Sequence, residues 1–301
     1  SDLRKQMKRT AFIAIVGRPN VGKSTLLNAI LGEKVAIVSS KPQTTRNRIL
    51  GIETRGEDQY VFMDTPGIHR PKNSLGEFMV KTADSSMRDA DAVVLVIDPG
   101  KAISPVEENV ISYLKTSGIP GILVLNKIDL YRREVLAQTI AAYAAKHDFA
   151  AVVPISARSG KNVDEVMQEC SAFLAESEWF FPEDMITDQP ERQIAAEVIR
   201  EKVLRALDEE VPHGVAVVIE EFTDEKTMVR IRAEIFCEKA SHKGIIVGKG
   251  GETLKRIGTN ARQELERILG VKVYLNLWVK VKENWRESAR TVQNFGYRND
   301  D

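Results

Sequence analysis

The sequence predicts an α/β fold of two domains: a doubly wound domain with a mostly parallel sheet, followed by a smaller α+β domain. In the first part, short apolar runs alternate with helical stretches, the pattern of a parallel sheet with helices on both faces. In the second part, the expected order is helix, strand, strand, helix, helix, strand. With 301 residues the chain is long enough for two hydrophobic cores. We expect an N-terminal arm over residues 1–9, a first domain over 10–177, a linker over 178–190 and a second domain over 191–301.

The elements of the first domain follow from the positions of its apolar runs. The expected strands are Ala11–Val16, Ile49–Glu53, Tyr60–Met63, Ala92–Ile97, Ile122–Leu125 and Val152–Ile155. The expected helices are Ser24–Leu31, Leu75–Met87, Ser104–Thr116, Glu134–Lys146 and Asn162–Leu174. Ligands of such sheets bind beyond the carboxyl ends of the strands. Residues that directly follow these runs are therefore the first candidates for a site.

The second domain begins after a change in composition at Glu178–Asp184 (EWFFPED) and contains clear periodic patterns. The expected elements are an amphipathic helix from Glu191, strands at Val215–Glu221 and Met228–Cys237, a short helix at His242–Val247 and a helix at Glu252–Leu269. The last expected strand, near Val271–Lys282, alternates strictly, with Lys272, Tyr274, Asn276, Trp278, Lys280 and Lys282 on one face. Such alternation predicts a half-buried strand with a solvated, basic and partly aromatic outer face.

Overall charge and the cysteines exclude little by themselves. Lys and Arg number 43, and so do Asp and Glu, so net charge indicates no partner. No apolar run reaches membrane-spanning length and no secretory signal is evident, so we expect neither a spanning helix nor secretion. Cys170 and Cys237 have no metal-ligand spacing and are expected to be buried thiols.

The residues that follow the first strand provide the strongest signal. Gly17–Ser24 (GRPNVGKS) matches the pattern G-x-x-x-x-G-K-[ST], between an expected strand and an expected helix. In this arrangement backbone N–H groups and the helix dipole attract phosphate, Lys23 adds a positive charge, and the Ser24 hydroxyl can hold Mg²⁺. The sequence therefore predicts a nucleoside triphosphate site that includes Gly17, Asn20, Val21, Gly22, Lys23, Ser24 and Thr25.

Two further segments add groups for the metal and the terminal phosphate. Asp64–Gly67 (DTPG) closes the strand Tyr60–Met63, where Asp64 can hold the Mg²⁺ shell and the Gly67 N–H can approach a γ-phosphate. A polar loop contains Thr44 and Thr45, either of which can reach Mg²⁺ and order the loop when triphosphate is bound; the alternative is an ordinary Ser/Thr-rich loop. We assign catalytic roles to Lys23, Thr44, Thr45, Asp64 and Gly67, and magnesium binding to Ser24, Thr45 and Asp64.

Specificity for guanine is expected from two strand ends. Asn126–Asp129 (NKID) follows Ile122–Leu125, and the Asp129 carboxylate can accept the N1–H and N2 amino hydrogens of guanine, a pair that adenine lacks. Asn126 can connect the base loop to the phosphate loop, and the stem of Lys127 can cover the ring. The segment Ser156, Ala157 and Arg158 can present an N–H to guanine O6. These motifs predict binding of GTP and GDP with Mg²⁺.

The residue after Gly67 is Ile68, where a Ras-like enzyme carries the glutamine that orients the attacking water. An isoleucine cannot do this, and the following His69 is a weak substitute. We therefore expect slow intrinsic hydrolysis that is assisted by a cation, a rearranged loop or a partner.

A turn in the second domain points to nucleic acid. Gly248–Gly251 (GKGG) lies between two expected helices, and residues 239–282 contain ten Lys or Arg and three acidic residues. A helix–GxxG–helix unit beside a sheet is the KH design, which binds single-stranded RNA. A solvated basic face and an anionic membrane surface are the alternatives. The expected RNA contacts are Ile246, Gly248, Lys249, Gly250, Gly251, Lys255, Lys280 and Lys282.

Taken together, GRPNVGKS, Thr44-Thr45-Arg46, DTPGI, NKID and the GxxG domain resemble the bacterial Era family over nearly the whole chain. The resemblance implies a P-loop GTPase domain followed by a type II KH domain, and a GTPase that assists assembly of the small (30S) ribosomal subunit. It implies that the KH groove binds the 3′ end of 16S rRNA best in the GTP form. It also implies that Asn20 helps to hold a stimulating K⁺, and that the protein is cytoplasmic, with peripheral inner-membrane contact.

We further expect a monomer. Two alternatives to this function stay open. One is a membrane-surface GTPase whose KH-like domain docks proteins rather than RNA, and the other is an RNA chaperone with a vestigial nucleotide site.

Overall fold

A computed structural model describes residues 7–41, 43–67, 70–207 and 211–298. Contacts divide the chain into two compact units, and we describe each by itself. The first comprises residues 1–36, 45–70 and 79–188, and the second comprises 37–44, 71–78 and 189–301. Two short segments from the first part of the sequence are therefore grouped with the second unit, which local sequence patterns did not indicate.

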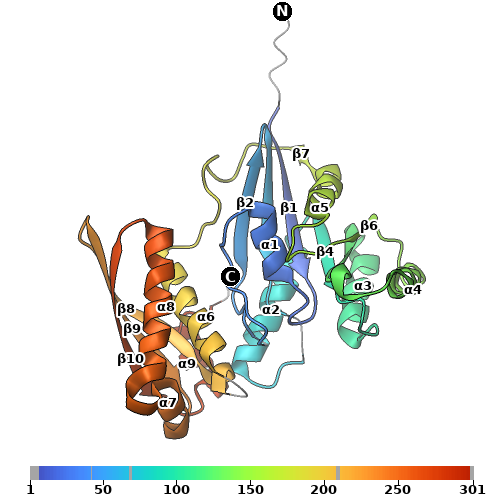
Figure 1. Ribbon diagram of the computed structural model, residues 1–301. Helices are drawn as coiled ribbons and strands as arrows, with labels where there is room; N and C mark the ends of the chain where they lie inside the picture. Colours follow the sequence, from blue (N-terminus) through green and yellow to red (C-terminus); the bar gives the residue numbers. More distant parts are fainter. Residues whose placement is uncertain (1–6, 42, 68–69, 208–210, 299–301) are drawn as a thin grey trace, which may run out of the picture. The chain divides into compact units, whose positions relative to one another are not determined.

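The first unit is built on a mostly parallel sheet, as predicted (Figure 1). Its strand order is β2-β3-β1-β4-β5-β6, with β7 paired to β1. Among the described strands of this sheet, only β2 and β7 are antiparallel to their neighbours. The strands are β1 (Arg9–Val16), β2 (Ile49–Arg55), β3 (Asp58–Asp64), β4 (Ala92–Ile97), β5 (Gly121–Leu125), β6 (Ala151–Pro154) and β7 (Ala175–Glu176). Their carboxyl ends therefore gather the motifs at one edge.

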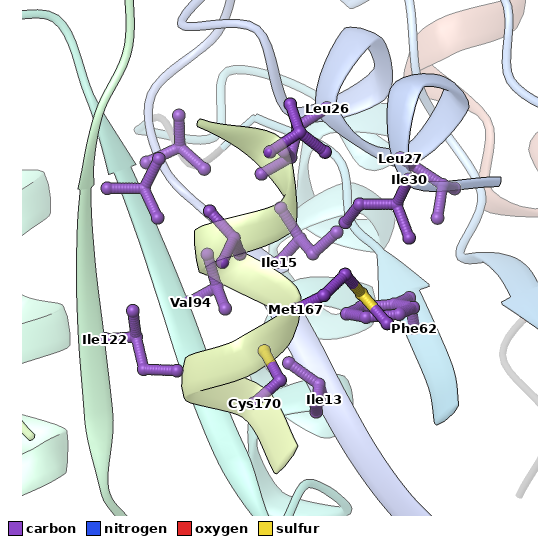
Figure 2. Close-up of a cluster of buried hydrophobic side chains, with 14 of the residues drawn as sticks. Ile13, Ile15, Leu26, Leu27, Ile30, Phe62, Val94, Ile122, Met167 and Cys170 are labelled. Atoms are coloured by element: carbon purple, nitrogen blue, oxygen red, sulfur yellow. The ribbon is translucent and has the colours of Figure 1, made fainter. Parts of the chain in front are cut away.

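Helices cover both faces of this sheet. They are α1 (Lys23–Leu31), α2 (Ser74–Arg88), α3 (Pro105–Ser117), α4 (Arg133–Ala144) and α5 (Val163–Cys170), with short 3₁₀ helices η1 (Ile128–Leu130) and η2 (Ser171–Phe173). Figure 2 shows the core on one face, where Leu26 of α1 and Met167 of α5 pack over Ile13 and Ile15 of β1. Residues of α3 and α4, including Leu114 and Tyr143, pack on the other face.

The helix expected at Asn162–Leu174 is shorter than predicted. It ends at Cys170, because the chain turns through η2 and then pairs with β1 through Ala175. By contrast, α3 begins where its sequence indicates. The Ser104 hydroxyl accepts a hydrogen bond from the Val106 N–H, and Glu107 completes a capping box.

The second unit has the predicted helix–strand–strand–helix–helix–strand order (Figure 1). Its elements are α6 (Glu191–Ala206), η3 (Val211–Gly214), β8 (Ala216–Asp224), β9 (Met228–Cys237), α7 (Ala240–Val247), η4 (Lys249–Gly251), α8 (Glu252–Leu269), β10 (Lys272–Val281), η5 (Trp285–Glu287) and α9 (Ala289–Asn294). The sheet order is β10-β9-β8, with β10 parallel to β9. Side chains of α6 and α8, such as Ile199 and Leu265, form a core with Ile231 and Val273 of the sheet.

Burial confirms the alternation of the last strand at four positions, but residues 275–277 are all partly exposed and Val281, expected on the buried face, is exposed. Val273 and Val279 are buried in the core, whereas Tyr274 and Trp278 on the opposite face are about half exposed. Within the described part of the chain, no helix is long and apolar enough to cross a membrane.

Candidate functional site

The phosphate loop joins β1 to α1 and requires glycine at two positions. A Cβ on Gly17, whose φ is +155°, would lie 2.5 Å from the Val96 carbonyl oxygen. At Gly22, with φ +104°, a Cβ would lie 2.1 Å from the Asn126 side-chain nitrogen. Both positions therefore require glycine because of a close neighbour, β4 at Gly17 and Asn126 at Gly22, as well as because of the backbone conformation. The loop leads directly into the N-terminus of α1, which favours an anion.

Lys23 is a buried cation at the start of α1. Its Nζ donates a hydrogen bond to the Arg18 carbonyl oxygen at 2.7 Å, which holds the ammonium over the loop. Burial lowers the pKa of Lys23 to about 8, although the nearby Asp64 acts in the opposite direction. A phosphate group would add negative charge to that of Asp64 and so favour the charged form of Lys23.

Three oxygen-bearing side chains meet beside the phosphate loop. Ser24 Oγ donates to Asp64 Oδ2 at 2.6 Å and lies 2.9 Å from Thr45 Oγ1. The other carboxylate oxygen, Asp64 Oδ1, is buried and has no hydrogen-bond partner among the described residues. Burial raises the pKa of Asp64 to about 6, against the opposing effects of the Ser24 hydrogen bond and of Lys23. Mg²⁺ prefers hydroxyl and carboxylate oxygens as ligands, so this cluster, in which Asp64 Oδ1 has no partner within the described chain, fits a magnesium site.

The structure separates the two threonines of the polar loop. The Thr45 hydroxyl lies with Ser24, whereas the Thr44 hydroxyl donates to the Lys41 carbonyl oxygen at 2.6 Å and lies 3.0 Å from Ser39 Oγ. The Thr44 hydroxyl therefore does not join Ser24, Thr45 and Asp64, which we call the metal group, although the sequence assigned both threonines to catalysis.

The end of β3 supplies the remaining phosphate-site residues. Thr65 Oγ1 donates to the Ile15 carbonyl oxygen at 2.7 Å, which ties this segment to β1. A Cβ on Gly67 would lie 2.7 Å from Pro19 Cα, so this segment passes close to the phosphate loop. Ile68 and His69, singled out from the sequence, lie outside the described residues.

The base loop is linked to the phosphate loop by two side chains. The Asn126 amide donates to the Val21 carbonyl oxygen at 2.8 Å and accepts from the Ala157 N–H at 3.0 Å. Lys127 has a left-handed backbone, φ +62°, and its Nζ donates to the Asn20 carbonyl oxygen at 2.9 Å. This network places the 126–129 loop and the 156–158 loop beside Gly17–Ser24, as the sequence predicts.

The remaining base-site residues differ in exposure. Asp129 lies in η1 with its side chain exposed, so its carboxylate is accessible to a ligand. Ser156 and Ala157 are buried, whereas Arg158 is exposed. Thr25 belongs to the first turn of α1, next to Ser24.

One residue of this network was missed by the sequence analysis. Asp98, directly after β4, accepts hydrogen bonds from the Gly100 N–H at 3.0 Å and from the Tyr131 hydroxyl, and pairs with Lys127 Nζ at 3.5 Å. Burial raises the pKa of Asp98, but these donors outweigh it and the pKa lies below its ordinary value. Its position, an aspartate at a strand end like Asp64, was the signal that could have identified it.

In the second unit the GxxG turn has the backbone that only glycine adopts readily. Gly248, Gly250 and Gly251 have φ of +75°, +62° and +77°. A Cβ on Gly248 would lie 2.3 Å from Thr253 Oγ1, whereas nothing lies near a Cβ on Gly250. The backbone on the outer side of the turn is thus open to a ligand.

The predicted lysines of this surface are not equivalent. Lys249, Lys255 and Lys282 are exposed. Lys280 is also exposed but forms an ion pair with Glu234 on the neighbouring strand. Lys249, Lys255 and Lys282 therefore present exposed charges, whereas the charge of Lys280 is paired with Glu234.

The structure corrects the prediction for Ile246, which precedes the GxxG turn. It was expected to contact RNA, but it is completely buried in the core with Ile257 and Leu265 of α8. Its neighbour Ile245 is the exposed residue, with half of its surface accessible. In a helix of eight residues between two turns, the apolar run does not show which of two adjacent isoleucines faces inward.

The chain is similar to known proteins over both units. Residues 12–127 match the family described as 50S ribosome-binding GTPase, and residues 210–286 match the KH domain. GTPase Era of Clostridioides difficile (strain 630) is 51% identical over 294 residues, covering 97% of this chain and 99% of that protein. GTPase Era of Alkaliphilus metalliredigens (strain QYMF) is 47% identical over 291 residues, covering 96% and 99%.

Solved structures show the same likeness. A variant of Aquifex aeolicus Era bound to GDP·AlF4⁻ has a TM-score of 0.92 at 45% identity, covering 96% of this chain and 99% of that one. A structure of Era in complex with MgGDPNP and nucleotides 1506–1542 of 16S ribosomal RNA has a TM-score of 0.92 at 44% identity, with the same coverage. With both domains matched and relatives about half identical along their whole length, the chain belongs to the Era family of GTPases.

Proposed function

We propose that this GTPase is a switch that binds the 3′ end of 16S rRNA and assists assembly of the small ribosomal subunit. The observation that supports it best is that one chain contains both the oxygen cluster Ser24, Thr45 and Asp64, beside the phosphate loop, and an open GxxG turn. The related Era structure with MgGDPNP and 16S rRNA nucleotides 1506–1542 supports the same RNA and the same nucleotide here.

In the nucleotide site we assign the phosphates to Lys23 and to the amides that lead into α1. The Gly67 N–H is assigned to the γ-phosphate, because this segment passes close to the phosphate loop. Ser24, Thr45 and Asp64 would hold Mg²⁺, which withdraws charge from the phosphate oxygens when bound. Because Asp64 Oδ1 has no hydrogen-bond partner among the described residues, a metal shell would satisfy it.

For the base, Asp129 accepts the two donor groups of guanine. Asn126 fixes the loop through Val21 and Ala157, the Lys127 stem covers the ring, and the Ser156–Arg158 loop provides the N–H for O6. The Lys127 side chain is already held in place by its hydrogen bond to the Asn20 carbonyl oxygen.

Hydrolysis is proposed to be slow without assistance, because Ile68 stands where other GTPases carry the water-orienting glutamine. Asn20, with its left-handed backbone in the phosphate loop, is the proposed K⁺-holding residue. We further propose a cytoplasmic monomer with peripheral inner-membrane contact, and domain limits of 10–177 and 191–301.

On the RNA side, we assign the contacts to Gly248, Lys249, Gly250, Gly251, Lys255 and Lys282, with Ile245 in place of the buried Ile246. Lys280 contributes less, because its ammonium is already paired with Glu234. Glycine backbone near sugar-phosphate, next to exposed lysines, is the contact that KH domains use for unpaired RNA.

The deciding experiment measures binding of a labelled 3′-terminal 16S rRNA oligonucleotide and a scrambled one, with a non-hydrolysable GTP analogue and with GDP. Selective binding that is stronger with the analogue is expected. Equal, weak and salt-sensitive binding in all four combinations would overturn the RNA role.

A variant with Lys249→Asp and Gly250→Asp should lose RNA affinity and keep GTP affinity. Lys115→Asp on α3 is the matched charge control, because its side chain is exposed in the first unit. Recovery of the protein with floated vesicles rather than with RNA would favour the membrane-surface alternative.

A further inference from the structure

An arginine of α6 holds the backbone of the 37–44 segment, which belongs to the second unit. Arg200 Nη1 donates to the Gln43 carbonyl oxygen at 3.1 Å, and Nη2 donates to the Thr44 carbonyl oxygen. The Arg200 side chain is only 1% exposed and is oriented by an ion pair with Glu197 at 2.7 Å. The guanidinium is planar and rigid, and Glu197 fixes its orientation. The positions of the two carbonyl oxygens that it binds are therefore restricted as well.

The beginning of the same segment is held by Glu201, the next residue of α6, and by Arg205, about one turn further along the helix. The Val38 N–H donates to Glu201 Oε2 at 2.9 Å, and Arg205 Nη2 donates to the Val38 carbonyl oxygen at 3.0 Å. Glu201 is fully buried and is supported by Lys202 at 3.1 Å. Both ends of the 37–44 segment are therefore attached to one helix by charged groups, which form stronger hydrogen bonds than neutral ones.

The attachment is adjacent in sequence to the metal group. The carbonyl carbon of Thr44, whose oxygen Arg200 binds, is bonded directly to the nitrogen of Thr45. The Thr45 hydroxyl lies 2.9 Å from Ser24 Oγ. Since consecutive Cα atoms are about 3.8 Å apart, the position of the Thr44 carbonyl restricts where the Thr45 side chain can reach.

We propose that Arg200 is a positioning residue for the GTPase reaction: it holds the Gln43 and Thr44 carbonyls so that Thr45 is presented to the Mg²⁺ of the triphosphate. This inference rests on the proposed role of Thr45 as a metal ligand. Because coupling between a ligand and a protein contact is reciprocal, the triphosphate in turn stabilises the contact between α6 and the 37–44 segment.

Arg200 keeps its charge in this buried place. Burial disfavours the guanidinium, but Glu197, Tyr297 and Glu201 together outweigh this effect and the pKa of Arg200 lies above its ordinary value. A purely structural role would also explain a buried, paired arginine. The two roles differ in what the loss of Arg200 changes: a structural loss affects both nucleotides alike, whereas a positioning loss affects only the triphosphate with Mg²⁺.

The test compares full-length variants by their affinities for a non-hydrolysable GTP analogue and for GDP, over a range of Mg²⁺ concentrations. Arg200→Lys and Arg200→Met should weaken analogue binding about tenfold, the worth of a hydrogen bond to a charged group, and leave GDP affinity unchanged. Half-maximal analogue binding should also need more Mg²⁺. Arg192→Met is the matched control, because Arg192 of α6 donates to the Ile219 carbonyl oxygen and not to the 37–44 segment.

Thr45→Ala separates the two proposals. If it leaves the ratio of analogue to GDP affinity unchanged, the proposed metal role of Thr45 fails. If it lowers the ratio while both Arg200 variants keep it, or if those variants lose both nucleotides equally, the positioning role is overturned and the proposed function stands.

Should Arg200→Met not fold, Arg205→Ala keeps the test open, because that side chain is half exposed. It removes the two N–H donors that Arg205 directs to the Val38 carbonyl oxygen, and it should lower analogue affinity about threefold, because this contact is partly solvated. An unchanged ratio in Arg205→Ala and Arg200→Lys together would overturn the inference.

Discussion

The Asn126 side chain donates a hydrogen bond to the Val21 carbonyl oxygen across 105 positions of sequence, at 2.8 Å. The same amide accepts the Ala157 N–H. One buried side chain thereby fixes the phosphate loop, the base loop and the 156–158 loop relative to one another. Buried amides of this kind have no solvent to replace a lost partner.

Asn126→Ala should therefore lower both guanine-nucleotide affinity and stability. It leaves the Val21 carbonyl and the Ala157 N–H unpaired, which costs roughly 2–4 kcal/mol of the free energy of unfolding. Urea unfolding and nucleotide titration measure the two effects. Asn28→Ala is the control, since Asn28 bridges Val35 and Ala36 by similar bonds; an equal loss of nucleotide affinity there would contradict a specific role for Asn126.

Gly22→Ala should abolish nucleotide binding. The new Cβ would lie 2.1 Å from Asn126 Nδ2, and the backbone φ of +104° is strained for alanine. Gly32→Ala has positive φ but nothing within 4 Å, so it should cost only about 1–2 kcal/mol in stability and keep GTP affinity. Comparable affinity in the two variants would show that the contact with Asn126 is unimportant.

Asp129→Asn should shift preference from guanosine to xanthosine nucleotides. The carboxylate accepts from two donors of guanine, whereas an amide offers a donor that matches the O2 of xanthine. Competition between GTP and XTP for the labelled analogue measures the shift. A variant that still prefers GTP would place base recognition elsewhere.

The two adjacent isoleucines of α7 should behave differently. Ile246→Ala removes a fully buried side chain and should destabilise the protein by about 2–5 kcal/mol, whereas Ile245→Ala should hardly change stability. Thermal unfolding tests the first expectation. If Ile245→Ala instead weakens RNA binding at unchanged stability, the exposed residue is the one that contacts RNA.

Cys170 should resist alkylation in the folded protein. It is fully buried, and burial raises the pKa of its thiol to about 12, so almost no thiolate is present at pH 8. Iodoacetamide labelling followed by mass spectrometry should detect modification only after denaturation. Rapid labelling of the native protein at this position would contradict the packing of α5 on the sheet.

Much of the fold and of the nucleotide site could be predicted because the signals are local. Apolar runs, helix caps and glycines act over a few neighbouring residues, and in a parallel sheet the residues after successive strands meet at one edge. Lys23, Ser24, Asp64 and Asn126 lie together for this reason. The period-2 pattern of β10 likewise assigned Val273 and Val279 to the buried face and Tyr274 and Trp278 to the exposed face.

Only tertiary contacts distinguish adjacent residues that have the same chemistry. Sequence could not choose between Thr44 and Thr45, or between Ile245 and Ile246, because each pair has the same chemistry and only packing separates them. It also could not reveal that Arg200 binds the Thr44 carbonyl, because these residues are 156 positions apart and a backbone oxygen leaves no mark in the sequence. Local sequence therefore determined the residues of the nucleotide site, whereas only the folded chain shows that the 37–44 segment is attached to α6.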